Sequence, residues 1–165
     1  MTLTQTLAIF CTKYLIFILI IVAGVWFLFG APKGRRKEVV IFGASSLLLT
    51  FLLSLIAAKL YSDPRPFAVG HFTPLVAHGF DNGFPSDHTL LSVAVACIVW
   101  RYNSLLGIVL FNLALIIGFS RVYVGVHHLI DIFGAVIIAI VSALLVSIAL
   151  DAITNKRKVM SGQDH

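Results

Sequence analysis

Five long apolar runs, separated by short polar segments, constrain the fold of this chain more than any other feature. A helix needs about 20 apolar residues to cross the hydrocarbon core of a bilayer. The chain is 59% hydrophobic and 12% charged, with a mean hydropathy of +1.02, whereas soluble domains are about 25% charged. We therefore predict an all-α polytopic membrane helix bundle, in which residues 1–165 form a single domain with about five transmembrane helices. The predicted spans are residues 7–29, 39–60, 86–100, 104–121 and 127–151.

The basic residues predict how these helices are oriented. Eight of the twelve Lys and Arg residues fall in inner segments: Lys33, Arg35, Arg36, Lys37, Arg101, Lys156, Arg157 and Lys158. Short basic loops stay in the cytoplasm, so we expect residues 31–38 and 155–165 inside the cell and residues 61–85 and 121–128 outside. Because the positive residues lie at loops and not along a groove, they indicate contacts with membrane lipids and argue against nucleic acid as a partner.

Three polar clusters interrupt the apolar runs at the outer ends of the predicted spans. They are residues 59–66, 83–88 and 120–131. Polar groups at membrane depth are costly and usually mark function. Because the clusters carry Arg, His, Ser and Asp side chains, we predict that they converge on one outward-facing site that handles a phosphate group.

Arg65 and Arg121 are the candidate phosphate ligands in these clusters, because a guanidinium offers planar, bidentate donors. Lys59 is a third candidate cation. Ser86 is the predicted N-cap of the third span, where free backbone N–H groups and the helix dipole attract an anion. The alternatives are that the arginines bind lipid headgroups passively and that Ser86 only caps its helix.

His127 and Asp131 are the candidate catalytic pair. They are four residues apart, so a helix that begins near residue 127 places them on one face. A carboxylate behind an imidazole fixes its tautomer and leaves the other nitrogen free to attack. His128 lies about 100° away from that face and is the weaker candidate. The alternative is an interfacial histidine that pairs with Asp131 for structural reasons alone.

Together these residues resemble the signature of the PAP2 family, the type 2 phosphatidic acid phosphatases. The family pattern is Lys, six residues, Arg-Pro; then Pro-Ser-Gly-His; then Ser-Arg, five residues, His, three residues, Asp. Residues 120–131 match the third part fully, and residues 85–88 match the second with Asp87 in place of Gly. The first part is matched at Arg65-Pro66, with Lys59 one residue closer than the pattern has it.

This resemblance, which covers residues 59–131, implies a role for each matched residue. His127 attacks phosphorus and forms a phosphohistidine, Asp131 orients the ring, and His88 protonates the leaving group. The phosphoryl oxygens are held by backbone amides and by Arg65, Arg121 and Ser86, with Lys59 as a further candidate. The resemblance implies no metal and no other cofactor. The family core has six spans, so five spans imply a shortened N-terminal part.

The segments 64–67 and 84–88 resemble the undecaprenyl-diphosphatase branch in particular. This implies hydrolysis of undecaprenyl diphosphate to undecaprenyl phosphate at the outer face of the plasma membrane, which recycles the lipid carrier for cell-wall synthesis. The alternatives are a phosphatidylglycerophosphate or phosphatidic acid phosphatase and, from another class, a non-catalytic lipid-binding or transport protein of the same fold. Intact His88, His127 and Asp131 favour an enzyme, because passive binding needs no nucleophile.

Overall fold

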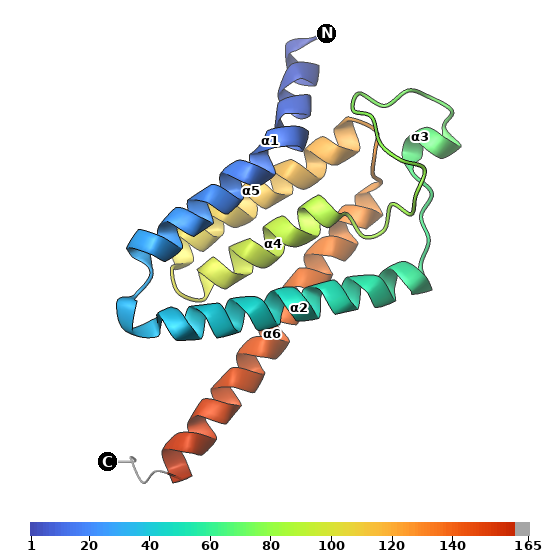
Figure 1. The fold of residues 1–165 in the computed structure, drawn as a ribbon. Coiled ribbons are helices and arrows are strands. Elements are labelled where there is room, and N and C mark those ends of the chain that lie inside the picture. The colour runs from blue at the N-terminus through green and yellow to red at the C-terminus, as the bar shows by residue number, and fades with distance from the viewer. Residues whose placement is uncertain (161–165) are drawn as a thin grey trace.

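The computed structural model describes residues 1–160 as a bundle of helices (Figure 1). In chain order these are α1 (Leu3–Val25), α2 (Arg36–Leu60), α3 (Pro66–Val69), α4 (Asp87–Trp100), α5 (Ser104–Tyr123) and α6 (Leu129–Met160). A π-helical turn, Trp26–Gly30, continues α1, and a 3₁₀ turn, Lys33–Arg35, leads into α2. The predicted all-α membrane bundle is confirmed. Of the predicted inner tail, residues 161–165 lie outside the described residues.

The bundle consists of long helices around a shorter central one. Among the described residues, four segments are long and apolar enough to cross a bilayer: Leu3–Gly30, Lys33–Leu60, Ser104–Tyr123 and Leu129–Lys156. The third predicted span corresponds to α4, which has 14 residues and is therefore about 21 Å long, short of the roughly 30 Å hydrocarbon core. α4 contacts α1, α2, α5 and α6. A helix enclosed by its neighbours does not have to match the thickness of the hydrocarbon. Four of the five predicted spans are therefore long enough to cross the bilayer, and the fifth, α4, is a shorter helix that they surround.

Small residues allow α4 and α5 to pack closely. A Cβ added at Gly107 would lie 2.4 Å from the Cα of Trp100, and one added at Gly118 would lie 3.0 Å from the hydroxyl of Thr89. Ala114, between the two glycines, is completely buried. Membrane helices use such small residues to bring their backbones together. The resulting hairpin sets the first turn of α4 beside the last turn of α5.

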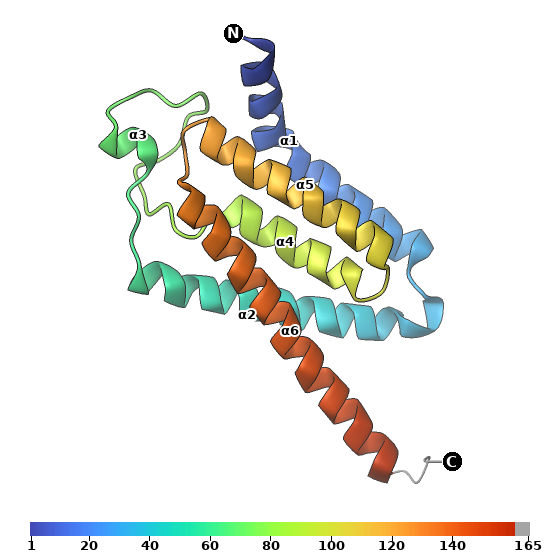
Figure 2. The same ribbon diagram turned by 180° about the vertical axis from the view of Figure 1, so that it is seen from behind.

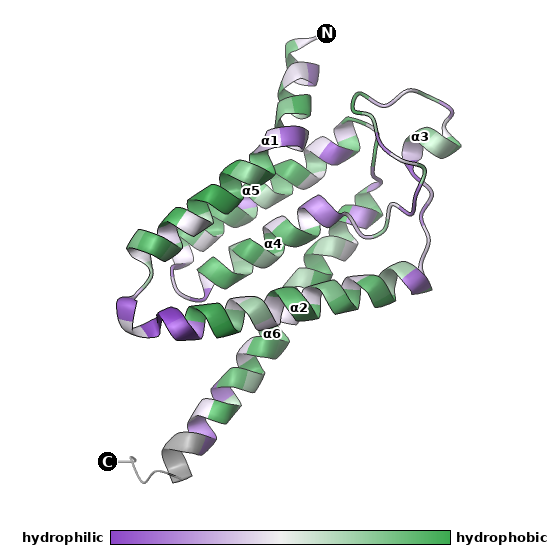
Figure 3. Cartoon of the chain, viewed as in Figure 1, coloured by the Kyte–Doolittle hydropathy of each residue, from purple (hydrophilic) through white to green (hydrophobic). Residues whose placement is uncertain are grey.

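The polar segments of the chain gather at the two ends of the bundle (Figure 3). The basic turn at residues 31–35 joins α1 to α2 at one end, and residues 101–103 join α4 to α5 at the same end (Figure 1). Residues 61–86 and 124–128 connect helices at the opposite end (Figure 2). The three polar clusters therefore share one end of the bundle.

Local capping explains where two of the helices begin, at residues other than those predicted. α1 begins earlier, since Thr2 and Gln5 form a capping box in which each side chain accepts the other's backbone N–H, at 2.9 and 3.3 Å. α6 begins at Leu129, two residues after the predicted start of the last span. His127 consequently lies in the turn between α5 and α6.

We predict that Gly107→Ala destabilises the protein. The new Cβ would meet the backbone of Trp100, which cannot move without shifting α4, and overpacking of this kind costs about 1–3 kcal/mol. The control is Gly24→Ala, because nothing lies within 4 Å of its new Cβ and Ala is favoured over Gly inside a helix by about 0.5–1 kcal/mol. Thermal unfolding in detergent is expected to give a lower Tm for Gly107→Ala and an unchanged or higher Tm for Gly24→Ala. Equal Tm values would contradict the close packing of α4 on α5.

Candidate active site

The site lies where the two loops at one end of the bundle meet. Five of the predicted site residues are almost completely buried there, with exposed fractions between 0% and 4%: Arg65, Ser86, Arg121, His127 and Asp131. They come from the loop after α2, the start of α4, the end of α5, the turn between α5 and α6, and the start of α6. Charged side chains are almost never fully buried unless they are paired, so the contacts of these residues define what the site can do.

His127 is held between a carboxylate and two guanidinium groups. Its Nδ1 lies 3.1 Å from Oδ2 of Asp131, and its Nε2 lies 3.2 Å from Nη1 of Arg65 and 3.3 Å from Nη2 of Arg121. Arginine nitrogens only donate, so Nε2 accepts from both and the ring proton sits on Nδ1, which donates it to Asp131. Burial lowers the pKa of His127, although the hydrogen bond with Asp131 opposes this shift. The ring is therefore neutral at neutral pH, and its Nε2 lone pair faces the two arginines.

Asp131 is also fixed by contacts that do not involve His127. Its Oδ2 accepts the backbone N–H of His128 at 2.9 Å, which caps the first turn of α6. Its backbone carbonyl accepts the N–H of Ser86 at 3.2 Å and so ties α6 to the start of α4. A Cβ added at Gly83 would lie 3.0 Å from Oδ2, so glycine leaves room for the carboxylate. The orienting group is thus in place before any ligand arrives.

The predicted contact between His127 and Asp131 is present, but the predicted shared helix face is wrong. The capping contact of Asp131 makes His128 the last residue before α6. A turn therefore brings the imidazole onto the carboxylate. His128 points elsewhere, and its Nδ1 lies 2.8 Å from Oδ2 of Asp63.

Two residues that the sequence analysis did not assign to the site, His78 and Asp81, contact the arginines. Nε of Arg65 donates to Oδ1 of Asp81 at 2.6 Å, and Nη2 of Arg121 donates to Nε2 of His78 at 3.0 Å. The hydrogen bond from Arg65 lowers the pKa of Asp81. Burial, together with the charges of both arginines, lowers the pKa of His78. Asp81 is therefore ionised and His78 neutral at neutral pH.

The start of α4 supplies backbone donors to the same place. Ser86 occupies the predicted N-cap position, but its side chain makes no capping hydrogen bond and accepts from the hydroxyl of Thr89 at 3.2 Å. The N–H groups of the first helical turn have no partner inside the helix and suit an anion. His88, in that turn, is partly buried and lies within electrostatic reach of Arg121 and His127. Its ring makes no hydrogen bond with any other described residue.

Lys59 stands apart from these contacts. It is exposed in the last turn of α2, and its amine has no hydrogen bond or ion pair within residues 1–160. A shift of one residue along a helix rotates a side chain by about 100°. The spacing to Arg65, one residue shorter than in the PAP2 pattern, therefore puts Lys59 on a different face of α2 from the preceding residue, which the pattern would use.

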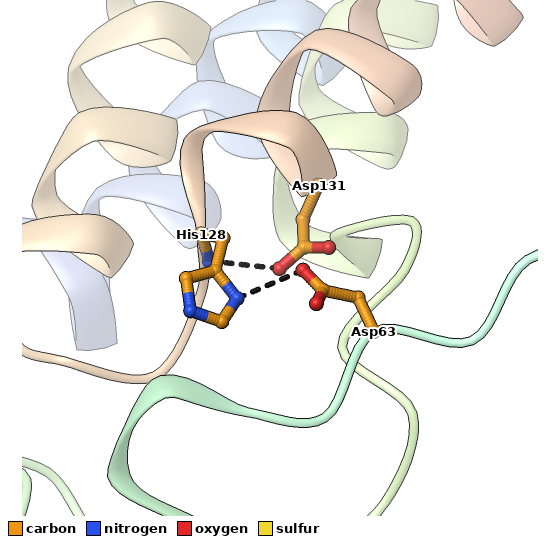
Figure 4. A group of neighbouring side chains, drawn as sticks. All are labelled: Asp63, His128 and Asp131. Carbon is orange, nitrogen blue, oxygen red and sulfur yellow. Dashed lines mark hydrogen bonds and ion pairs between the residues drawn. The ribbon is translucent and has the colours of Figure 1, made fainter. Parts of the chain in front are cut away.

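Asp63, His128 and Asp131 form the group with the spacing of a metal site (Figure 4). One ligand atom from each lies within 4.8 Å of the others. The Asp131 oxygen that faces Asp63 is Oδ2, which already accepts hydrogen bonds from His127 and from the backbone of His128, while Oδ1 is buried without a hydrogen-bond partner among the described residues. A cation there would compete with the bond that orients His127. We therefore assign the contact between Asp63 and His128 to the anchoring of the loop that carries Arg65.

Comparison with known proteins identifies relatives over most of the chain. The family model described as the PAP2 superfamily matches residues 38–154. Undecaprenyl-diphosphatase BcrC of Bacillus subtilis is 33% identical over 145 residues, which cover 86% of this chain and 72% of BcrC. The putative undecaprenyl-diphosphatase YbjG of Escherichia coli is 32% identical over 153 residues, covering 92% and 76%. The bacitracin transport permease protein BcrC of Bacillus licheniformis is 30% identical over 138 residues, covering 83% and 67%.

Two solved structures share the fold. LpxE of Aquifex aeolicus has a TM-score of 0.69 at 24% identity, over 86% of this chain and 85% of that one. The first transmembrane PAP2-type phosphatidylglycerolphosphate phosphatase from Bacillus subtilis has a TM-score of 0.51 at 21% identity, over 93% and 89%.

We predict that the arginine pair binds inorganic phosphate. Arg121→Ala removes one of the two guanidinium groups, and a hydrogen bond to a charged group contributes about 1.5–3 kcal/mol, so phosphate affinity is expected to fall roughly tenfold to hundredfold. Lys59→Ala removes the same charge from the same end of the bundle and is expected to change affinity by less than about fivefold. Phosphorus NMR titration of the purified protein in detergent measures both affinities. Equal losses would mean that phosphate responds to net charge and not to the arginine site.

Proposed function

The chain belongs to the PAP2 superfamily, and on this premise we propose that it converts undecaprenyl diphosphate to undecaprenyl phosphate. One observation carries the proposal: the Nε2 lone pair of His127 lies within 3.3 Å of guanidinium nitrogens of Arg65 and Arg121. A nucleophile beside two phosphate ligands suits phosphoryl transfer. The diphosphate substrate is supported by two relatives, at 33% and 32% identity, that are named undecaprenyl-diphosphatases.

The terminal phosphate of the substrate binds between the arginines. Arg65 and Arg121 donate to its oxygens, and the backbone N–H groups that follow Ser86 complete the set of donors. Arg121 and the α4 amides are fixed by the packing of α4 and α5, and Arg65 is held by its hydrogen bond to the carbonyl of Val126 at 2.9 Å. They therefore stabilise the charge of the transition state without rearranging. Lys59, exposed at the end of α2, remains a candidate for the outer part of the diphosphate.

The transfer then proceeds in two steps. The Nε2 lone pair of His127 attacks the terminal phosphorus, and the bond from phosphorus to the bridging oxygen breaks in line with the attack. His88 enters this step protonated, because the negative charge of the bound diphosphate stabilises its imidazolium form, and it gives that proton to the departing lipid phosphate. Asp131 stabilises the phosphohistidine through Nδ1. His88 next takes a proton from water, which attacks the phosphohistidine and releases inorganic phosphate. His127 returns to its neutral form.

We propose that this reaction needs no metal. The two arginines and the amides of α4 neutralise the phosphoryl oxygens on the Nε2 side of His127. The Asp63, His128 and Asp131 group lies on the Nδ1 side, where Asp131 bonds the ring. A cation bound there would not reach the phosphoryl oxygens.

Two other functions fit parts of the same observations. A phosphatidylglycerophosphate or phosphatidic acid phosphatase would use the same residues, and one protein of the same fold carries the first of these names at 21% identity. A transport protein without catalysis agrees with the name of the Bacillus licheniformis relative. A buried nucleophile with its orienting carboxylate supports an enzyme, because transport requires neither.

The test is phosphate release by purified protein in the presence of EDTA, with undecaprenyl diphosphate, phosphatidylglycerophosphate and phosphatidic acid as substrates. We expect the diphosphate to give the highest kcat/KM. We expect His127→Ala to abolish turnover and His128→Ala to retain most of it, because only His127 faces the arginines. Acid-quenched wild-type protein is expected to carry label from a radioactive terminal phosphate, and His127→Ala none.

Each part of this proposal fails on a different result. If the protein releases phosphate from none of the three lipids, the transport alternative is supported. If it prefers phosphatidylglycerophosphate or phosphatidic acid, the substrate is a phosphate monoester and not the diphosphate. Loss of activity in EDTA that magnesium restores would overturn the metal-free mechanism. Near wild-type turnover by His127→Ala would make His128 the first residue to test as nucleophile.

We also propose that the protein lies in the plasma membrane with the site on the outer side. The support is the basic turn at residues 31–35, opposite the site. In a variant without native cysteines, Phe80→Cys is expected to react with an impermeant thiol reagent added to intact cells, because Phe80 is 85% exposed in the site loop. The matched position is Gly34→Cys in the basic turn, which should react only after the cells are opened. The reverse pattern would place the site inside.

A further inference from the structure

The chain supplies its own ligands to the arginine pair. Asp81 Oδ1 lies 2.6 Å from Nε of Arg65, and His78 Nε2 lies 3.0 Å from Nη2 of Arg121. The two ligands are neighbours, with Nδ1 of His78 3.7 Å from Oδ1 of Asp81. These guanidinium N–H groups are the donors that a phosphoryl group would use. An incoming anion therefore has to replace a carboxylate on Arg65 and an imidazole on Arg121.

Asp81 reaches the site from its open side. Its side chain is 64% exposed, whereas that of Arg65 is 4% exposed. Within the described residues, the carboxylate of Asp81 pairs with two side chains, those of Arg65 and His78, and with no side chain of a long helix. Rotation of one side chain is enough to take the carboxylate off Arg65 and into water.

The residue that follows is anchored, so this rotation leaves the site intact. Oδ1 of Asn82 accepts the N–H groups of Asp63 and Phe84 at 2.9 and 3.0 Å. Its Nδ2 donates to the carbonyls of Ala58 and Tyr61, both at 3.1 Å. The loop is therefore fixed at Asn82, directly beside a carboxylate that can be exchanged.

We propose that Asp81 is a built-in competitor for the phosphoryl site, which excludes singly charged phosphodiester headgroups and admits the more highly charged terminal phosphate of a lipid mono- or diphosphate. The proposal rests on the proposed function. On the Nε2 side of His127, two guanidinium groups and one carboxylate, Asp81, leave one net positive charge, with Asp131 on the opposite side of the ring. A phosphodiester carries one negative charge and gains nothing electrostatically by replacing Asp81. A terminal phosphate carries about 1.5 to 2 negative charges at neutral pH and does gain.

Selectivity against phosphodiesters is needed because the proposed site is surrounded by membrane lipids. The site opens at the membrane surface, where phosphodiester lipids greatly outnumber any lipid diphosphate. An unoccupied pair of arginines would bind those headgroups by the same charge-assisted hydrogen bonds. Discrimination then requires an element that acts against the wrong ligand, and a carboxylate on Arg65 is such an element.

The test compares Asp81→Asn with Asp87→Asn. Both remove one negative charge from the same end of the bundle. Asp87, exposed at the start of α4, acts on Arg121 through its charge alone, because it makes no hydrogen bond to an arginine within the described residues. Hydrolysis of undecaprenyl diphosphate is measured in mixed micelles in which phosphatidylglycerol, a singly charged phosphodiester, replaces zwitterionic phosphatidylcholine. A partly exposed ion pair contributes up to about fivefold in affinity. We therefore expect phosphatidylglycerol to inhibit Asp81→Asn at an about fivefold lower mole fraction than the wild type. Asp87→Asn loses a through-space interaction with Arg121 and no hydrogen bond, so we expect a clearly smaller change in that mole fraction.

A second readout needs no turnover. Phosphorus NMR titration with inorganic phosphate is expected to show about fivefold tighter binding to Asp81→Asn than to the wild type, and a clearly smaller gain for Asp87→Asn. If Asp81→Asn and Asp87→Asn change phosphate affinity equally, the affinity depends on net charge alone, and the proposal is overturned. Weaker phosphate binding by Asp81→Asn would also overturn it, because Asp81 would then be positioning Arg65. If the wild type hydrolyses no lipid phosphate, the proposed function fails, and the titration still decides whether Asp81 competes with an anion.

Discussion

The burial of two guanidinium groups at one end of a membrane bundle is the constraint on which the rest of the site depends. Arg65 and Arg121 are each 4% exposed, and buried charges require compensation. One carboxylate, Asp81, contacts them directly, while Asp131 lies on the far side of the His127 ring. Positive charge is therefore left over on the Nε2 side of the ring, where it attracts an anion. Burial, together with the charges of both arginines, keeps the imidazole neutral, with its lone pair turned toward the arginines.

The helix packing serves to hold this charge in place. α4 is short enough to begin inside the bundle, so Ser86 is completely buried at its start. The hydroxyl of Thr12 in α1 donates to that of Ser120 at 2.9 Å, immediately before Arg121 in α5. The backbone of Asp131 bonds that of Ser86 and joins α6 to α4. α4, α5 and α6 are thus each hydrogen-bonded to a neighbouring helix at a site residue or at the residue next to one.

The sequence was sufficient for features that depend on local pattern. Apolar run length located the helices, and the Ser-Arg, His and Asp spacing located His127 and its carboxylate, although a turn and not a helix face joins them. His78 and Asp81 had no such signal, because their loop has no periodicity and their arginine partners are 43 and 16 positions away. The length of α4 was predicted, but its place at the centre was not, since enclosure by four helices is a property of tertiary packing. Likewise, Lys59 fitted a motif by residue type, while its exposed position follows from where α2 ends.

Two carboxylates of the site illustrate how burial separates chemical roles. Asp131 is completely buried and accepts two hydrogen bonds on Oδ2, so its removal from the ring would leave an uncompensated charge in the protein interior. Asp81 is mostly exposed, and water can replace Arg65 as its partner at little cost. The first carboxylate is therefore permanent and suited to orienting a nucleophile through a whole reaction cycle. Asp81 can exchange Arg65 for water, so a ligand can displace it from the arginine. In the proposed mechanism, a carboxylate thus orients the imidazole on the Nδ1 side of His127, and a second carboxylate competes with phosphate on the Nε2 side.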